Sequence, residues 1–394
     1  MTYRYKIFSL FIVISFILTT ESCVEPIVPE LNNDDAAMML VVDAKITDQE
    51  GPFRVRLTNS VKVNVMFYLD PVPDADVHIY DDKGNSFQLF GEKNGWYETA
   101  DKKLKGIPGN AYTLSIITAD GMQYESTSVL MEEAAEIDSL YFEEVTHTRF
   151  QNNETFEENW LDILLDSHDP EGKIKYWWFE FEETWEVRML TDYISVQHSP
   201  PDAPSNITKE NISVSAEKIV CWVTKPSKSI LIDNTIGSSE NQIKRFPLQS
   251  LGPGEDKLHI RYSILVKQSS ISPELYDFWK LLKDVNENSG GIYDKMPAQI
   301  YGNISCCDGK SQALGYFSAI SVKSKRLFID KTEHHVETES AYQGCYYYDF
   351  DQVQWVPKSY FGTILRTGRK VYCSGDICAD CRAYGTNIKP AFWQ

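Results

Sequence analysis

The sequence predicts a mainly β protein, in which an N-terminal β-sandwich of immunoglobulin or transthyretin-like kind is followed by a larger β-rich domain carrying one main α-helix. In short runs separated by turn sequences, apolar and polar residues alternate with a period of two, which is typical of half-buried strands. One later segment instead repeats its apolar residues at helical spacing. A chain of 394 residues also exceeds the length at which one core keeps growing, so we expect two domains.

The first domain is assigned to residues 37–132. Phe53, Val55 and Leu57 alternate with polar residues, as in a strand with one buried face. Turns are predicted at 48–52, 81–85 and 119–121, and the last of these contains an Asp-Gly pair that favours tight hairpins. Several short strands at this spacing predict the sandwich. Its expected role is to dock a partner or to space the second domain from a membrane.

The second domain is assigned to residues 137–394 and begins with aromatic-rich strands. In the strand expected at 176–187, positions 177, 179 and 181 are aromatic whereas positions 180 and 182 are glutamates, which predicts a dry face and a wet face. Trp177, Trp178 and Trp185, with Trp160 and Trp222 nearby, are candidate binding aromatics, because ring planes stack on sugars and peptides. The alternative is that these rings pack in the core.

The main helix is predicted at about 273–287. Ser272 suits the N-cap, and Pro273 suits the first turn because its missing N–H needs no partner there. The segment 288–291 (Asn-Ser-Gly-Gly) ends the pattern. The apolar residues at helical spacing are Leu275, Phe278, Trp279, Leu282 and Val285. This stripe predicts core packing rather than a ligand site.

The amino terminus has the layout of a secretory signal. Two basic residues precede an apolar run from Ile7 to Leu18, and small residues lead to Cys23. A run of about 12 residues falls short of the roughly 20 needed to cross a bilayer as a helix. We therefore expect residues 1–22 to be a lipoprotein signal, Cys23 to carry the lipid anchor, and residues 23–36 to be a flexible tether. An ordinary signal peptide with an incidental cysteine is the alternative.

The charge balance excludes one class of partner. The chain has 38 basic and 57 acidic side chains, for a net charge of -19. Nucleic-acid binding depends first on neutralising phosphates with Lys and Arg, so this composition argues against it.

Cysteine usage predicts disulfides. Because exported proteins keep disulfides, we expect two or three bridges and at least one cysteine left over. A zinc site at Cys373, Cys378 and Cys381 is the alternative, but no second ligand pair matches them. The candidate disulfide cysteines are Cys221, Cys306, Cys307, Cys345, Cys373, Cys378 and Cys381.

The remaining motifs predict neither an enzyme nor a cofactor or metal site. The segment 333–337 (Glu-His-His-Val-Glu) offers two imidazoles and two carboxylates, yet a solvated loop or strand face explains it better. The chain has no nucleophile elbow, no zinc-protease motif and no phosphate-binding glycine loop. Ser139, within the sequence Asp-Ser-Leu, fits a short pattern for O-linked sugar attachment.

Several segments spread over nearly all of the mature chain match one known family. They are Leu40–Asp43, Tyr112–Leu114, Asp120–Gly121, Ser272–Trp279, Asn288–Gly291, Pro297, Tyr301–Ile304, Leu314–Phe317, Cys378–Cys381 and Lys389–Trp393. Through them the chain resembles the domain of unknown function 4249 family of Bacteroidota outer-membrane lipoproteins. That resemblance implies an outer-membrane location with the folded part at the cell surface, and a TonB-dependent transporter as partner.

The function that follows is an accessory subunit that captures a small ligand, peptide or glycan, or that helps assemble the transporter for nutrient uptake. The alternative is a surface-exposed hydrolase acting on glycans or peptides through some of its many carboxylates, since a pair of carboxyl groups can hydrolyse glycosides. Abundant acidic residues also produce such pairs by chance.

Overall fold

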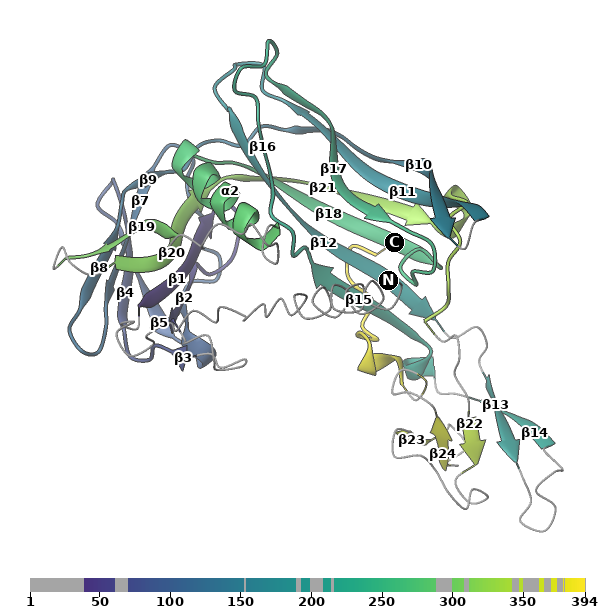
Figure 1. Ribbon diagram of the computed structural model, residues 1–394. Coiled ribbons are helices and arrows are strands. Elements are labelled where there is room, and N and C mark those ends of the chain that lie inside the picture. The colour runs from purple at the N-terminus through teal and green to yellow at the C-terminus, as the bar shows by residue number, and fades with distance from the viewer. Residues whose placement is uncertain are drawn as a thin grey trace, which may run out of the picture. The chain divides into compact units, whose positions relative to one another are not determined.

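Figure 1 shows the computed structural model of the chain. The predicted signal at 1–22, Cys23 and the predicted tether at 23–36 lie outside the residues that the structure describes. Within the described part, no helix is long and apolar enough to cross a membrane. The described residues are 39–60, 70–151, 154–188, 193–198, 208–213, 216–287, 300–307, 312–341, 347–349, 361–364, 370–373, 378 and 380–393.

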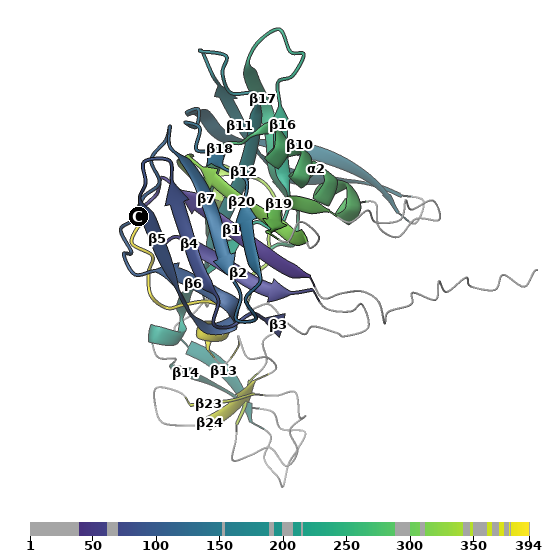
Figure 2. The same ribbon diagram turned by 90° about the vertical axis from the view of Figure 1, so that its left-hand side faces the viewer.

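The described residues are mainly β, as the sequence predicts, and most of the N-terminal strands belong to one eleven-stranded sheet. Figure 2 looks onto this sheet. Its strands are β1 (Leu40–Thr47), β2 (Arg54–Asn59), β3 (Asp70–Pro71), β4 (Asp76–Asp81), β5 (Ser86–Gly91), β6 (Trp96–Thr99), β7 (Ala111–Ile117), β8 (Gln123–Ser126), β9 (Val129–Leu130), β19 (Tyr301–Cys306) and β20 (Gln312–Ile320).

The predicted sandwich is wrong, because this sheet closes on itself. The hydrogen-bonded order runs β1-β20-β19-β8-β7-β4-β5-β6-β2, and β2 pairs again with β1. On its other edge β1 pairs in parallel with β20. Alternate side chains, including those of Val42, Val55 and Phe317, fill the interior of this closed sheet. Period two in the sequence predicts strands and their buried faces, but it does not say which distant strand completes the hydrogen bonding.

Two glycines allow the closing strands to approach one another. A Cβ at Gly302 would lie 1.5 Å from the carbonyl oxygen of Gly315, and a Cβ at Gly315 would lie 1.9 Å from that of Val42. Gly315 also has a φ of +95°, which side chains disfavour. Only glycine fits where β19, β20 and β1 meet.

Two further sheets enclose a second core. A three-stranded sheet has the order β10-β11-β17, and a five-stranded sheet, here the central sheet, has the order β15-β12-β18-β21 with β16 paired to β12. The bounds are β10 (Ile137–Gln151), β11 (Glu154–His168) and β17 (Gln242–Leu251), then β12 (Tyr176–Arg188), β15 (Val220–Pro226), β16 (Leu231–Asn234), β18 (Arg261–Ser270) and β21 (Val322–Asp330).

The remaining elements are short, except for one helix. A fourth sheet has the order β14-β13-β22-β24-β23. The described α-helix, α2, spans Pro273–Glu287, where the sequence predicts it. The other bounds are β13 (Tyr193–His198), β14 (Thr208–Ser213), β22 (Tyr347–Asp349), β23 (Phe361–Ile364) and β24 (Lys370–Cys373), with 3-10 turns η1 (Lys93–Gly95), η2 (Ala216–Lys218), η3 (Lys331–Glu333) and η4 (Cys381–Ala383).

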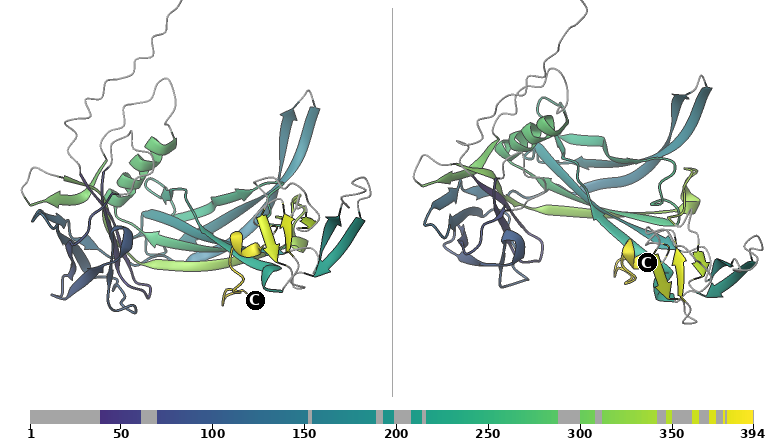
Figure 3. Two further views of the ribbon diagram at one scale, coloured as in Figure 1. Left: turned by 90° about the horizontal axis from the view of Figure 1, so that it is seen from below. Right: turned by 60° about the horizontal axis from the view of Figure 1, so that its bottom comes forward.

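The hairpin of β10 and β11 is longer than its partner strand. β17 pairs with β11 only over Leu161–His168, whereas β10 and β11 stay paired as far as Gln151 and Glu154. Figure 3 shows the two blue-teal strands continuing together beyond the sheet. Phe150 and Phe156 on this extension are exposed.

One face of β12 packs in the second core, together with a buried carboxylate. Glu183 accepts hydrogen bonds from the Tyr262 hydroxyl and the Gln249 amide, each at 2.8 Å, and its nearer oxygen lies 3.1 Å from the Lys257 ammonium. Burial and the Glu183 carboxylate raise the pKa of Tyr262 well above its usual value. The carboxylate is tolerated because every one of these partners satisfies it.

The chain passes from the closed sheet to the central sheet across a single residue, Ser321, which separates β20 from β21. Asp48 accepts hydrogen bonds from the Ser321 hydroxyl at 2.7 Å and from the Val322 amide at 2.9 Å. Nearby, the Lys45 ammonium lies 2.8 Å from a Glu180 carboxylate oxygen on β12. We call this set of contacts the sheet junction.

A disulfide joins Cys221 on β15 to Cys381 in η4, so two of the candidate cysteines are confirmed as a pair. Cys378 is also disulfide-bonded. Cys306 and Cys307 carry thiols, the first buried and the second exposed. Cys345 and the side chain of Cys373 lie outside the described residues.

Replacing Gly315 with alanine tests the closure of the sheet. We expect Gly315→Ala to lower the free energy of unfolding by about 3 kcal/mol or more, because the new Cβ meets the Val42 carbonyl. Gly84→Ala is the matched control: Gly84 has a φ of +86° but nothing within 4 Å of its Cβ position, so about 1–2 kcal/mol is expected. Denaturant unfolding measures both, and equal losses would contradict the close approach.

Candidate functional site

A groove lies between α2 and the closed sheet, with a volume of about 730 Å³. One wall is the exposed side of α2, and the other comes from β9, β19 and β20 (Figure 1). We call it the α2 groove. Its lining residues are Thr127, Ser128, Val129, Leu130, Glu132, Ser272, Glu274, Asp277, Phe278, Leu281, Ile300, Tyr301, Gly302, Asn303 and Tyr316.

Local sequence fixes where α2 begins. The Ser272 hydroxyl accepts a hydrogen bond from the Leu275 amide at 3.2 Å, which satisfies one of the unpaired N–H groups of the first turn. Pro273 is the first helical residue and has no N–H to satisfy.

Aromatic contacts fix which side of α2 faces the central sheet. The ring centroids of Tyr276 and Tyr176 are 4.9 Å apart, and those of Trp279 and Trp178 are 5.0 Å apart. The Tyr276 hydroxyl also accepts a hydrogen bond from the Asn234 amide at 2.7 Å. Because these contacts turn one side of α2 toward the central sheet, Glu274, Asp277 and Leu281 on another side line the groove.

The opposite wall is held by the backbone of β19 and β20. The Asn303 amide side chain donates to the Phe317 carbonyl and accepts from the Phe317 amide, both at 2.9 Å. The Asn303 carbonyl accepts from the Thr127 amide at 2.8 Å. These bonds bridge the irregular register between β19 and β20, so the wall is set by pairing within the closed sheet.

The groove is acidic. Glu132, Glu274 and Asp277 line it, and no lysine, arginine or histidine is among its described lining residues. Burial, with the Glu274 carboxylate, raises the pKa of Glu132, and the same two causes raise the pKa of Tyr316 against the lowering effect of its hydrogen bond with Ser272. Such a field favours a positively charged group.

The groove is also apolar at its rim. Leu130 is 53% exposed, Leu281 is 40% exposed and Tyr301 is 45% exposed. Large side chains that stay exposed together around a hollow mark a site of interaction more often than singly scattered ones do. Together with the carboxylates, they suit a partner segment that is both basic and apolar.

The candidate binding aromatics lie elsewhere. Trp177 is 0% exposed, Trp178 8% and Trp185 1%, and all three pack in cores. Rings buried to this degree present no plane for a ligand, so the surface expected from them is not formed by their side chains. Core packing, the alternative considered from the sequence, describes their positions.

Ser139 lies near the start of β10, where its hydroxyl donates to an Asp166 carboxylate oxygen at 2.9 Å. The side chain is half-buried. A sugar on this oxygen would replace that hydrogen bond, and O-glycosylation at Ser139 stays a prediction.

The two histidines of the 333–337 segment have separate surroundings. His335 lies 3.2 Å from a Glu144 carboxylate oxygen, whereas His334 is buried. In the described part of the chain, no group of three or more His, Cys, Asp or Glu side chains is arranged to hold a metal ion.

The sequence does not point to the α2 groove, because the wall that faces α2 combines residues 127–132 with residues 300–316, which are far apart in sequence. The available signal is the exposed side of the predicted helix, where the apolar Leu281 shares a face with Glu274 and Asp277.

Comparison with known proteins gives one result for the family. The chain belongs to the family described as Domain of unknown function (DUF4249), whose match covers residues 24–326. Membership of this family, which the sequence predicts, is therefore confirmed. No curated protein matches the chain.

Stability should depend on pH through His334. Burial, aided by the Lys331 charge, lowers the pKa of His334 below its usual 6.5. As the pH falls, His334 is therefore protonated in the unfolded chain at a higher pH than in the folded chain. The free energy of unfolding decreases from about pH 6.5 down to the lowered pKa of the folded state and is constant below it. We expect His334→Gln to flatten this part of the profile.

Denaturant unfolding of both proteins at intervals between pH 7.5 and 5 measures the effect. Carboxyl groups with lowered pKa values, such as Asp81 and Asp380, lose their contribution at lower pH. Glu132, whose pKa is raised, is present in both proteins, so the difference between the two profiles reports on His334. Parallel profiles for the two proteins would contradict the assignment.

Proposed function

We propose that the protein is a lipid-anchored accessory subunit of a TonB-dependent outer-membrane transporter, and that it acts by binding rather than by catalysis. In this proposal the anchor is on Cys23, the folded part stands at the cell surface, and the transporter admits the nutrient. The apolar leader that ends before Cys23 supports the anchor. The family resemblance supports the choice of partner.

The observation that carries the binding proposal is the α2 groove. Its exposed Leu130, Leu281 and Tyr301 would lose water on contact with a partner, and that loss of apolar surface drives association. Its carboxylates would select a basic segment of the transporter and speed the encounter. A groove with both features is suited to hold one segment of a partner in one orientation.

The groove is also rigidly framed, which favours binding. α2 is capped at Ser272 and held by its aromatic contacts with the central sheet, and Asn303 fixes the facing wall. A preformed surface loses little conformational freedom when a partner binds, so more of the interaction energy remains as affinity.

Purification of the native protein from outer membranes tests the proposal. We expect a TonB-dependent transporter to be recovered with the wild-type chain in mild detergent. The double variant Glu274→Lys with Asp277→Lys should reduce that recovery about tenfold, because like charges placed against a basic segment repel it.

Glu240→Lys is the matched control, since Glu240 is exposed and does not line the groove. It changes the net charge in the same direction and should leave recovery of the transporter unchanged. Recovery of the wild-type chain without any transporter would contradict the partnership. Equal recovery with the groove and control variants would contradict the groove as its site.

A further inference from the structure

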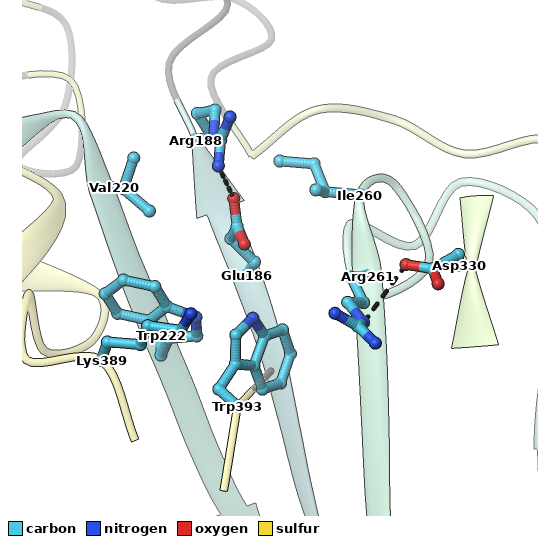
Figure 4. A pocket seen from close by; sticks show the side chains of 9 residues that line it. All are labelled: Glu186, Arg188, Val220, Trp222, Ile260, Arg261, Asp330, Lys389 and Trp393. Carbon is cyan, nitrogen blue, oxygen red and sulfur yellow. Dashed lines mark ion pairs between the residues drawn. The ribbon is translucent and has the colours of Figure 1, made fainter. Parts of the chain in front are cut away.

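A second hollow lies at the end of the central sheet, on the same face of β12 as Glu180 and Glu182, and has a volume of about 450 Å³. Figure 4 shows its side chains. The strand register places Trp222 opposite Glu186 and Arg261 opposite Asp330, so adjacent strands β15, β12, β18 and β21 each contribute at least one residue. Lys389 and Trp393, from the C-terminal segment, complete the lining. We call it the Trp222 pocket.

The Trp222 pocket has an excess of positive charge within an acidic protein. The Arg188 guanidinium lies 2.6 Å from a Glu186 carboxylate oxygen, and the Arg261 guanidinium lies 3.2 Å from an Asp330 oxygen. Within each pair the positive and negative charges cancel (Figure 4). Lys389 is the third cation of the lining, and no ion pair with it is found among the described residues. One positive charge is therefore left to attract an anion.

The pocket also contains a hydrogen-bond donor without an acceptor. Trp222 is only 9% exposed, and its indole Nε1 has no hydrogen-bond partner among the residues that the structure describes. In Figure 4 this nitrogen is turned toward Trp393 and the middle of the pocket. Trp160, Trp177 and Trp279 also have unpartnered indole nitrogens, but these residues do not line the pocket. A buried N–H without an acceptor is unfavourable, and a ligand oxygen would satisfy it.

We propose that the Trp222 pocket binds the carboxylate of a small organic ligand. The Trp222 indole donates a hydrogen bond to one carboxylate oxygen, and the Lys389 ammonium neutralises the charge. A single excess positive charge matches a carboxylate better than a doubly charged phosphate. The volume lies within the range of pockets for small ligands. An acidic sugar and the free carboxyl end of a short peptide share this chemistry.

This inference does not rest on the transporter partnership, because it concerns binding by the purified chain alone. The Trp222 pocket and the α2 groove share no lining residue. Loss of either proposal would leave the other standing.

Two matched ligand pairs test the inference. One pair is D-glucuronate and D-glucose, and the other is an N-acetylated dipeptide with a free carboxyl end and its amide. Each is titrated into ¹⁵N-labelled protein while the indole N–H signals are followed by NMR, and affinities are measured by calorimetry. We expect the acid of at least one pair to bind and to shift the Trp222 indole signal, whereas its neutral counterpart does neither. The pair that responds identifies the source of the carboxylate.

Two variants locate the binding. Trp222→Phe keeps a ring but removes the N–H donor, and Lys389→Met keeps the apolar stem but removes the charge. Each should weaken binding of the acid about tenfold, as expected when a hydrogen bond or ion pair to a charged group is lost. Lys228→Met is the control, because Lys228 is exposed and does not line the pocket.

Lys389 is exposed, so Lys389→Met decides the question even if Trp222→Phe does not fold. The inference is overturned if neither acid binds at about 10 mM, because a site with a Kd of about 1 mM would be about 90% occupied at that concentration. Equal binding of an acid and its neutral counterpart would overturn it too. So would an acid that binds Lys389→Met as tightly as it binds Lys228→Met.

Discussion

The parallel pairing of β1 with β20 is the constraint on which the rest of the structure depends. It closes the N-terminal sheet, and because β20 is followed after one residue by β21, it also joins that sheet to the central sheet. Asp48 fastens the crossing point through the Ser321 hydroxyl and the Val322 amide. Residues near 45 and near 320 must therefore fold together. Parallel pairing over such a separation in sequence is slow to form, since a long loop must close before any contact is gained.

Both proposed sites follow from this arrangement. At the sheet junction, Ile320 and Val322 pack with Trp178 and Leu275, which seats α2 beside the closed sheet and so forms the α2 groove. The Trp222 pocket lies further along the same strand, near Glu186. Eight residues separate Trp178 from Glu186, and at about 3.3 Å per residue this corresponds to roughly 26 Å along β12. One sheet thus supports a surface suited to a protein partner and a separate pocket suited to a small anion.

Local features of the fold could be predicted from the sequence. Alternation at Phe53, Val55 and Leu57 identifies a buried strand face, and Ser272 with Pro273 identifies the start of the helix. Strand partners could not be predicted, because a period of two is the same for a sandwich and a closed sheet. The aromatic run at 176–187 predicted a binding surface as one alternative, yet Trp177 and Trp185 are buried because another sheet covers that face. The Trp222 pocket combines residues from four strands and the C-terminal segment. The sequence does not show how these strands pair or in which register, so it could not predict that these residues meet.

Some features of the protein serve the fold, and others are better explained by function. Glycine at 315 and the bonds of Asp48 serve the closure of the sheet. In contrast, the Trp222 indole nitrogen has no hydrogen-bond partner among the described residues, and Leu130 and Leu281 keep large apolar side chains exposed beside the α2 groove. Buried donors without acceptors and exposed apolar side chains depart from what a stable fold favours, and such departures are expected at functional sites.

Native-state hydrogen exchange of the whole chain tests the central claim most directly, by comparing the amides of β1 with those of β20. If the two strands are partners in one closed sheet, both sets of amides exchange slowly and open with the same free energy. Rapid exchange across β20 while β1 stays protected would show that the N-terminal strands form a sheet without it, and would contradict the account.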